Sequence, residues 1–284
     1  MSAVRRAGVC GWPVAHSRSP LIHGYWLARY HLEGAYERFA VPPRGFADFA
    51  ASIGVGGLVG ANVTVPHKEA AFAACDRLTD SARATGAVNT LWREDGALWG
   101  DNTDVAGFLS SLDAEAPGWR ECVDCAVVLG AGGVARAIVH GLVSRGVERV
   151  VIVNRTRERA VALAERFGPV ARVATWDELP QLLAKASLLA NATILGMAGQ
   201  PPLDLNLAPL KAEAVVADVV YVPLATQLVE AAWRRGCVAV GGLGMLLRQA
   251  APGFARWFGK TPEVTAELRA LIEADLSAAE KGRT

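Results

Sequence analysis

The sequence lacks any long uninterrupted hydrophobic run, although 52% of its 284 residues are hydrophobic. No stretch approaches the roughly 20 apolar residues that a membrane-spanning helix needs. Arg5 and Arg6 near the start are not followed by an apolar segment of secretory length. We therefore expect no membrane segment, no signal peptide and a cytoplasmic location.

An excess of charge of either sign is also lacking, because 29 basic side chains are balanced by 28 acidic ones. A nearly neutral chain has no general electrostatic attraction for nucleic acid or for an acidic membrane surface. The composition therefore argues against both as partners.

Cysteine is scarce, with five residues scattered along the chain. Cys122 and Cys125 form a single C-x-x-C, without a second such pair and without paired histidines nearby. Zinc sites and disulfide frameworks normally show more ligands or an even count. The sequence predicts no metal site, and we expect the cysteines to be thiols in a reducing compartment.

The length of the chain exceeds the size at which one hydrophobic core usually stops growing, which predicts two domains. In the first, residues 88–92 and 97–100, separated by Glu94-Asp95-Gly96, predict a β-hairpin. In the second, apolar strands alternate with helices such as 133–144, and the predicted strands are 126–129, 149–153, 170–174, 188–192, 215–220 and 238–240. This alternation is typical of a doubly wound parallel sheet, so the expected fold class is α/β.

A glycine-rich segment, Gly130-Ala131-Gly132-Gly133-Val134-Ala135, follows the first of these strands and opens a helix. It fits G-x-G-x-x-G/A, where the first glycine allows a tight turn and the second lets backbone N–H groups reach a pyrophosphate. A glycine-rich turn without a ligand would have the same letters, but the strand–helix–strand context favours a dinucleotide site.

The end of the next strand indicates which dinucleotide binds. An NAD enzyme places an acid there, whereas this chain has Asn154-Arg155-Thr156, with Arg159 close behind. A guanidinium group matches phosphate geometry, and a carboxylate would repel the 2′-phosphate of NADP. The alternative is a set of solvated arginines at a helix start, which we expect of Arg157. The sequence predicts NADP.

Polar residues gather at the strand ends of the first domain. They form Ser17-Arg18-Ser19, residues 62–68 ending in Lys68, Asn89-Thr90 and residues 100–104. Hydroxyls, amides, an ammonium and a carboxylate suit a small polyhydroxylated anion as substrate. Single members have ordinary explanations: we expect Ser19 to cap a helix that begins at Pro20, and Asp101 to serve a turn.

These motifs follow one another as in a known family, and over essentially its whole length the chain resembles the shikimate dehydrogenases. The resemblance rests on residues 11–20, 62–68, 86–90, 100–104, the loop from Gly130, and residues 154–156, 218–223 and 241–249. It implies reversible NADPH-dependent reduction of the 3-keto group of 3-dehydroshikimate to shikimate, a step of aromatic amino acid biosynthesis. It also implies an N-terminal α/β substrate domain (residues 1–104, completed by helices in 243–284), a Rossmann-like NADP domain (105–242), and a monomer or homodimer.

Residue by residue, the resemblance implies that Lys68 and Asp104 form the catalytic pair, and it leaves open which of them passes the proton. Substrate binding is implied for Ser17, Ser19, Thr64, Asn89, Asp104, Tyr221 and Gln249. NADP binding is implied for Asp80, Gly130, Ala131, Gly132, Gly133, Val134, Asn154, Arg155, Thr156, Arg159, Val219 and Gly242.

Two positions put details in question. Asn191-Ala192-Thr193 resembles the family's turn beside the cofactor, but Ile194 follows where serine or proline is expected. His67 is a rival acid to Lys68, although adjacent side chains at a strand end should diverge.

Other functions share part of the pattern. Quinate or an amino analogue of shikimate could be the substrate, although the NAD-linked quinate branch typically has an acid where Asn154-Arg155 stands. A non-catalytic NADP-sensing module would have little need for both Lys68 and Asp104. A Rossmann-type methyltransferase fits poorly with Arg155 and with the absence of an acid at that strand end.

Overall fold

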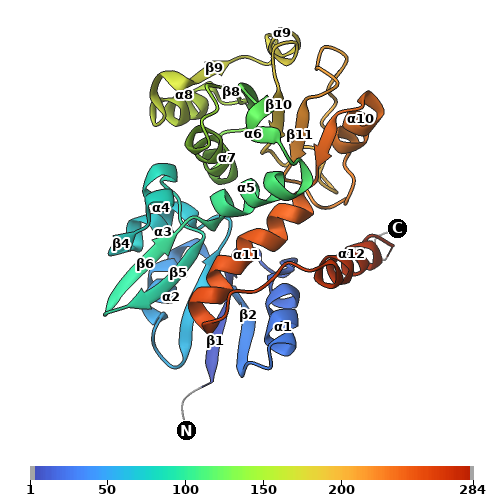
Figure 1. Ribbon diagram of the computed structural model, residues 1–284. Coiled ribbons are helices and arrows are strands. Elements are labelled where there is room, and N and C mark those ends of the chain that lie inside the picture. Colours follow the sequence, from blue (N-terminus) through green and yellow to red (C-terminus); the bar gives the residue numbers. More distant parts are fainter. Residues whose placement is uncertain (1–3, 282–284) are drawn as a thin grey trace. The chain divides into compact units, whose positions relative to one another are not determined.

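The computed structural model describes residues 4–281 and divides into two compact units (Figure 1). The N-terminal unit contains the chain up to Thr103 and Gln249–Ala274, and the central unit contains Asp104–Arg248 and the chain from Asp275. The second change of unit falls inside helix α11 (Gly242–Phe258). Among the described residues, no helix is both long and apolar enough to cross a membrane.

The N-terminal unit contains a mixed six-stranded sheet in the order β2-β1-β3-β5-β6-β4. Strands β1, β2 and β3 run parallel, whereas β5 runs antiparallel to β3 and β6. The predicted hairpin is confirmed as β5 and β6, joined by Asp95 and Gly96, which both have positive φ as a tight hairpin turn requires. The strands are β1 Arg5–Gly11, β2 Gly34–Ala40, β3 Leu58–Val63, β4 Arg77–Leu78, β5 Thr90–Glu94 and β6 Ala97–Asp101.

The helices of this unit are mostly short. They are α1 Ser19–Arg29, α2 Phe46–Ser52, α3 Lys68–Ala74 and α4 Asp80–Thr85, together with parts of α11 and α12 (Ala266–Lys281). The prediction that Ser19 caps α1 is wrong, because Arg18 occupies the cap position and Ser19 is the first helical residue. Ser17 takes over part of the capping, since its hydroxyl accepts the backbone N–H of Ser19 at 3.3 Å.

An aromatic cluster surrounds a fully buried histidine of α1. His23 stacks on Tyr36 with ring centroids 3.8 Å apart and contacts Trp26, Phe254 and Trp257. Burial lowers the pKa of His23 to about 3, so the ring is neutral and packs as an aromatic side chain.

This histidine should make the stability of the protein depend on pH. Below pH 6.5, the ordinary histidine pKa, His23 is protonated in the unfolded chain. In the folded chain it stays neutral down to about pH 3, so the protein loses stability as the pH falls between these values. We expect this site to lower the free energy of unfolding by about 1.4 kcal/mol for each pH unit in that window. Urea unfolding of wild type and His23→Phe at several pH values measures the difference. Identical pH dependence in the two proteins would contradict the assignment.

The central unit contains an all-parallel six-stranded sheet in the order β12-β11-β10-β7-β8-β9, which confirms the predicted doubly wound fold. Its strands are β7 Cys125–Leu129, β8 Arg149–Val153, β9 Ala171–Ala174, β10 Leu188–Asn191, β11 Val215–Asp218 and β12 Val238–Val240. The chain leaves β7 toward β8 on one side and returns to β10 on the other. The carboxyl ends of β7 and β10 thus form the switch point where such sheets bind ligands.

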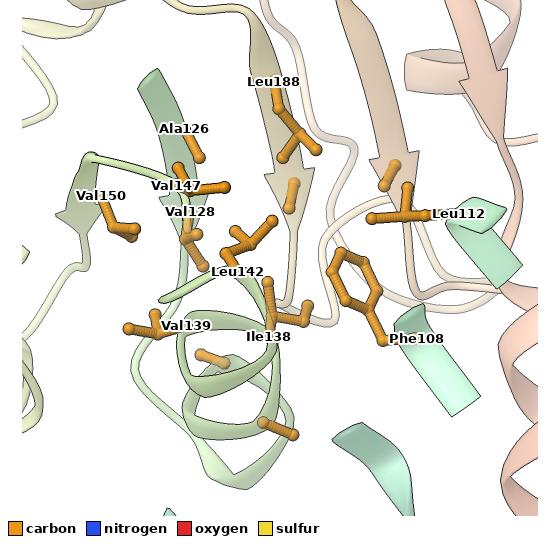
Figure 2. Close-up of a cluster of buried hydrophobic side chains, with 14 of the residues drawn as sticks. Phe108, Leu112, Ala126, Val128, Ile138, Val139, Leu142, Val147, Val150 and Leu188 are labelled. Carbon is orange, nitrogen blue, oxygen red and sulfur yellow. The ribbon is translucent and has the colours of Figure 1, made fainter. Parts of the chain in front are cut away.

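Both faces of this sheet are covered. Ala126 and Val128 of β7 face one apolar core, and Val127 and Leu129 face the other. Figure 2 shows the first core, where side chains of α7 and α5 pack on the sheet. The helices are α5 Thr103–Glu115, α6 Trp119–Cys122, α7 Gly133–Ser144, α8 Arg157–Glu165, α9 Leu179–Leu183 and α10 Gln227–Arg235.

Candidate active site

The glycine-rich loop connects β7 to α7 at the switch point. Gly130 has φ +111°, and a Cβ there would lie 3.0 Å from the carbonyl oxygen of Ala192. The position therefore requires glycine for both conformation and space. Gly132 precedes the first turn of α7, where the N–H groups lack partners within the helix and can bind an anion. A glycine-rich turn that leads into a helix N-terminus is typical of loops that bind anions.

A cavity of about 610 Å³ lies beside this loop within the central unit. One part of its lining is cationic and polar, from Asn154, Arg155, Thr156 and Arg159. The turn is fixed by Asn154, whose side-chain amide donates to the carbonyl of Thr156 at 2.7 Å. The rest is largely apolar and includes Trp176, Ile194, Leu195, Pro201, Pro202 and Leu203. Guanidinium groups beside an apolar wall suit a base-bearing nucleotide with an extra phosphate.

Ile194 does not prevent the turn that precedes it. Asn191 Oδ1 accepts from the backbone N–H of Thr193 at 3.0 Å and from its hydroxyl at 2.7 Å. The same hydroxyl oxygen accepts the N–H of Leu195 at 3.1 Å. The side chain of Ile194 is 57% exposed and forms part of the cavity wall. The departure from the family pattern therefore changes the lining of the cavity and leaves the turn intact.

The four polar segments of the N-terminal unit meet at one edge of its sheet. Strands β1 and β3 are parallel, with Cys10 opposite Val63, so the chain after Gly11 and the chain after Val63 leave the sheet on the same side. The antiparallel β5 begins there, with Thr90 opposite Asn62, and β6 ends there, with Asp101 opposite Thr90. The structure thus brings together segments that the sequence shows only as separate strand ends.

Within this edge the side chains are held in defined orientations. Ser17 Oγ donates to Ser19 Oγ at 3.2 Å. Asn89 is buried, and its Oδ1 accepts from the hydroxyl of Thr90 at 3.0 Å and from the N–H and hydroxyl of Thr103 at 2.8 and 3.0 Å. Such fixed polar groups lose little entropy when they bind a ligand.

Lys68 and His67, at the end of residues 62–68, have different surroundings. Lys68 is the first residue of α3 and is partly exposed. His67 is buried, its Nε2 lies 2.7 Å from the carbonyl oxygen of Val41, and its ring stacks on Phe46. His67 is thus buried and packed against its neighbours, so Lys68 is the candidate acid of this segment.

Comparison with known proteins identifies the family of this chain. Models for the shikimate dehydrogenase substrate binding domain, shikimate / quinate 5-dehydrogenase and the shikimate 5′-dehydrogenase C-terminal domain match residues 9–91, 121–196 and 242–272. A shikimate dehydrogenase (NADP(+)) of Methylocella silvestris is 57% identical over 278 residues, which cover 98% of this chain and 99% of the relative. The chain belongs to the shikimate dehydrogenase family.

Solved structures of this family have the same fold. The shikimate 5-dehydrogenase of Thermus thermophilus, in complex with NADP(H) and shikimate, is 36% identical with a TM-score of 0.84, covering 97% of this chain and 99% of that one. The quinate dehydrogenase of Corynebacterium glutamicum, in complex with NAD, is 28% identical with a TM-score of 0.87, covering 95% and 99%. The fold is thus common to shikimate and quinate dehydrogenases, so the substrate must be argued from residues.

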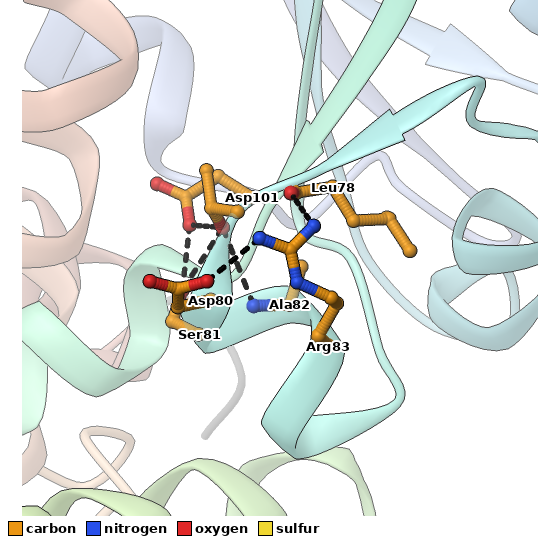
Figure 3. A network of polar contacts seen from close by, with 7 residues as sticks. Leu78, Asp80, Ser81, Ala82, Arg83 and Asp101 are labelled. Carbon is orange, nitrogen blue, oxygen red and sulfur yellow. Dashed lines mark hydrogen bonds and ion pairs between the residues drawn. The ribbon is translucent and has the colours of Figure 1, made fainter.

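Figure 3 shows the polar contacts of Asp80, for which the resemblance implies NADP binding, and of Asp101, which we expected to serve a turn. Asp80 is strongly exposed and forms an ion pair with Arg83 at 2.6 Å. Asp101 is more than a turn residue: its Oδ1 accepts from the hydroxyls of Thr79 and Ser81 and from the N–H of Asn102. It joins the start of α4 to the end of β6, which the sequence alone did not indicate.

Three further residues belong to the last segments on which the family resemblance rests, namely Val219, Tyr221 and Gln249. Val219 and Tyr221 follow β11 in the central unit, whereas Gln249 lies on α11 in the N-terminal unit. All three are partly buried. Their contacts with ligands stay predictions.

The segment after β11 is organised by a buried carboxylate that sequence reasoning missed. Asp218 accepts from the amide of Asn191 at 2.9 Å, the hydroxyl of Thr226 at 2.6 Å and the N–H of Val220 at 3.0 Å. Burial raises the pKa of Asp218, and these hydrogen bonds oppose the rise. The carboxylate fixes the backbone at Val219, one of the residues assigned to NADP.

Gly242 starts α11 against the same segment. A Cβ on Gly242 would collide with the backbone carbonyls of Val219 and Val220. We expect Gly242→Ala to lower the free energy of unfolding by about 1–3 kcal/mol, as overpacking typically does. Gly24→Ala is the control, because a Cβ there meets nothing within 4 Å and α1 should gain stability. Urea unfolding measures the free energy of unfolding of both variants. If Gly242→Ala were as stable as Gly24→Ala, the close approach of Gly242 to the carbonyls of Val219 and Val220 would not limit stability.

Proposed function

We propose that the protein is an NADP-dependent shikimate dehydrogenase that reversibly reduces 3-dehydroshikimate to shikimate. One observation carries the proposal: the chain matches a protein named shikimate dehydrogenase (NADP(+)) at 57% identity over 98% of its own length. The polar edge of the N-terminal unit supports it, because hydroxyl, amide and ammonium groups suit a polyhydroxylated carboxylic acid.

The cofactor assignment is supported by the central unit. The loop has room only for glycine at position 130, and Arg155 and Arg159 line the cavity beside it. We assign the pyrophosphate to the loop of Gly130, Ala131, Gly132, Gly133 and Val134, and the 2′-phosphate to Asn154, Arg155, Thr156 and Arg159. Val219, Gly242 and Asp80 complete the proposed NADP site. When bound, NADPH supplies the hydride that the protein itself cannot.

The substrate is assigned to the polar edge and its neighbours. Ser17 and Ser19 donate to the carboxylate, and Thr64, Asn89, Asp104, Tyr221 and Gln249 bind the ring hydroxyls. The N-terminal unit is then the substrate domain and the central unit the NADP domain.

Lys68 and Asp104 carry the chemistry in this proposal. When hydride reaches the ketone carbon, negative charge develops on the ketone oxygen. The ammonium of Lys68 stabilises that oxygen and supplies a proton to it. Asp104, which is buried in the first turn of α5, orients the lysine and accepts from a substrate hydroxyl.

Initial rates with shikimate and quinate, each paired with NADP and with NAD, test the proposal. We expect kcat/KM to be greatest for shikimate with NADP. A higher kcat/KM for quinate with NAD would assign the protein to the quinate branch.

We propose a cytoplasmic location, since all five cysteines are free thiols, the state that a reducing compartment maintains.

A further inference from the structure

A chain of hydrogen bonds reaches the proposed substrate residue Asn89 through three side chains that have no role in the function above, Tyr36, Asn62 and Thr90. The hydroxyl of Tyr36 lies 2.6 Å from Asn62 Oδ1. Asn62 and Thr90 are only 5% and 2% exposed. Polar groups this deeply buried depend on the partners they have.

The surroundings of Asn62 determine the direction of its bond with Tyr36. The Nδ2 end of the amide lies 3.3 Å from the backbone carbonyl of Asn89, an oxygen that can only accept. The nitrogen must face that carbonyl, so the oxygen must face Tyr36. Tyr36 is therefore the donor, and without its hydroxyl the buried oxygen of Asn62 loses this partner.

Burial raises the pKa of Tyr36 well above its ordinary value, so the phenol keeps its proton. That proton is the one that Tyr36 donates to Asn62 Oδ1.

The chain continues from Asn62 to Asn89. Asn62 Nδ2 donates to Thr90 Oγ1 at 3.1 Å, and Thr90 Oγ1 donates to Asn89 Oδ1 at 3.0 Å. The orientation of the Asn89 amide therefore depends on a series of hydrogen bonds that begins at Tyr36 and passes through Asn62 and Thr90. Aligned chains of this kind strengthen their members cooperatively.

His23 provides a rigid support for Tyr36. The two rings are parallel within 3° and 3.8 Å apart. His23 is fully buried. Trp257 contacts Tyr36 as well, with ring centroids 6.0 Å apart. This packing fixes where the hydroxyl of Tyr36 points.

We propose that Tyr36 is a positioning residue of the substrate site, whose hydroxyl orients Asn89 through Asn62 and Thr90. The inference rests on the proposed function, which assigns Asn89 to the substrate. Tyr36 should therefore affect the binding of shikimate. It should not affect NADP, whose proposed site lies almost entirely in the central unit.

Tyr36→Phe removes the hydroxyl and keeps the ring on His23. We expect KM for shikimate to rise by about tenfold, the size of one lost hydrogen bond, with KM for NADP unchanged. Tyr25→Phe is the matched control, because that hydroxyl also bonds within the N-terminal unit, to Thr265 and Arg29. Its kinetics should equal those of wild type.

Thr90→Val removes the next hydroxyl of the chain and should raise KM for shikimate as well. The double variant Tyr36→Phe/Thr90→Val should lose less than the two single losses combined, because both act on one chain. If Tyr36→Phe does not fold, Thr90→Val decides alone, and a wild-type KM would overturn the proposal. So would a folded Tyr36→Phe that keeps its KM for shikimate, or one that changes both KM values equally. A wild-type protein inactive on shikimate would instead refute the proposed function.

Discussion

Replacing Lys68 with alanine is expected to lower kcat for shikimate oxidation by about 10²–10⁴-fold, with KM changed much less. The reason is that the ammonium interacts with a charge that exists only as the reaction proceeds, so its loss raises the barrier more than it weakens substrate binding. The fold should tolerate the change. Lys68 begins α3, alanine is a good helix former, and the backbone bond from Val88 to the carbonyl of residue 68 is retained.

Steady-state kinetics of purified Lys68→Ala measure this effect, with circular dichroism to establish that the variant is folded. Lys185→Ala is the control, because Lys185 is an exposed lysine of the central unit to which we assign no role. A folded Lys68→Ala with near-normal kcat would show that another group supplies the proton.

Replacing Arg155 with alanine is expected to raise KM for NADP by roughly ten- to a hundredfold, since a charge-assisted contact with phosphate is worth about 1.5–3 kcal/mol. NAD lacks the 2′-phosphate, so its KM should be nearly unchanged and the preference for NADP should narrow. Arg159 lines the same cavity and can share the phosphate, so some discrimination should persist.

The decisive quantity is kcat/KM for both cofactors in wild type and variant. Arg157→Ala provides a close control, because Arg157 starts α8 two residues further on but does not line the cavity. Equal losses for NADP and NAD in Arg155→Ala would mean that the arginine supports the fold or the adenosine. A wild-type preference for NAD would overturn the cofactor assignment.

Much of the central unit could be predicted from the sequence because its signals are local. Helix 133–144 and strands 149–153 and 238–240 have the predicted bounds, since a glycine-rich turn and continuous apolar runs mark them directly. The arginines after β8 could be identified for a similar reason, because their position follows from the strand that precedes them.

The parts that could not be predicted depend on contacts between distant segments. Tyr36 and Asn62 are 26 residues apart and meet only because β2 and β3 flank β1. The sequence predicts only a turn role for Asp101, because its hydrogen-bond donors Thr79 and Ser81 belong to another segment. The local pattern predicts that Ser19 caps a helix, yet Ser17 provides the hydroxyl that accepts the backbone N–H of Ser19. Local sequence patterns carry no information on such partners.

Identification of the reaction product tests the account most directly. Purified protein is incubated with 3-dehydroshikimate and NADPH, and the product is identified by nuclear magnetic resonance while the absorbance of NADPH is followed. We expect NADPH to be consumed and shikimate to appear in equal amounts. NADPH that is not consumed, or a product other than shikimate, would contradict it.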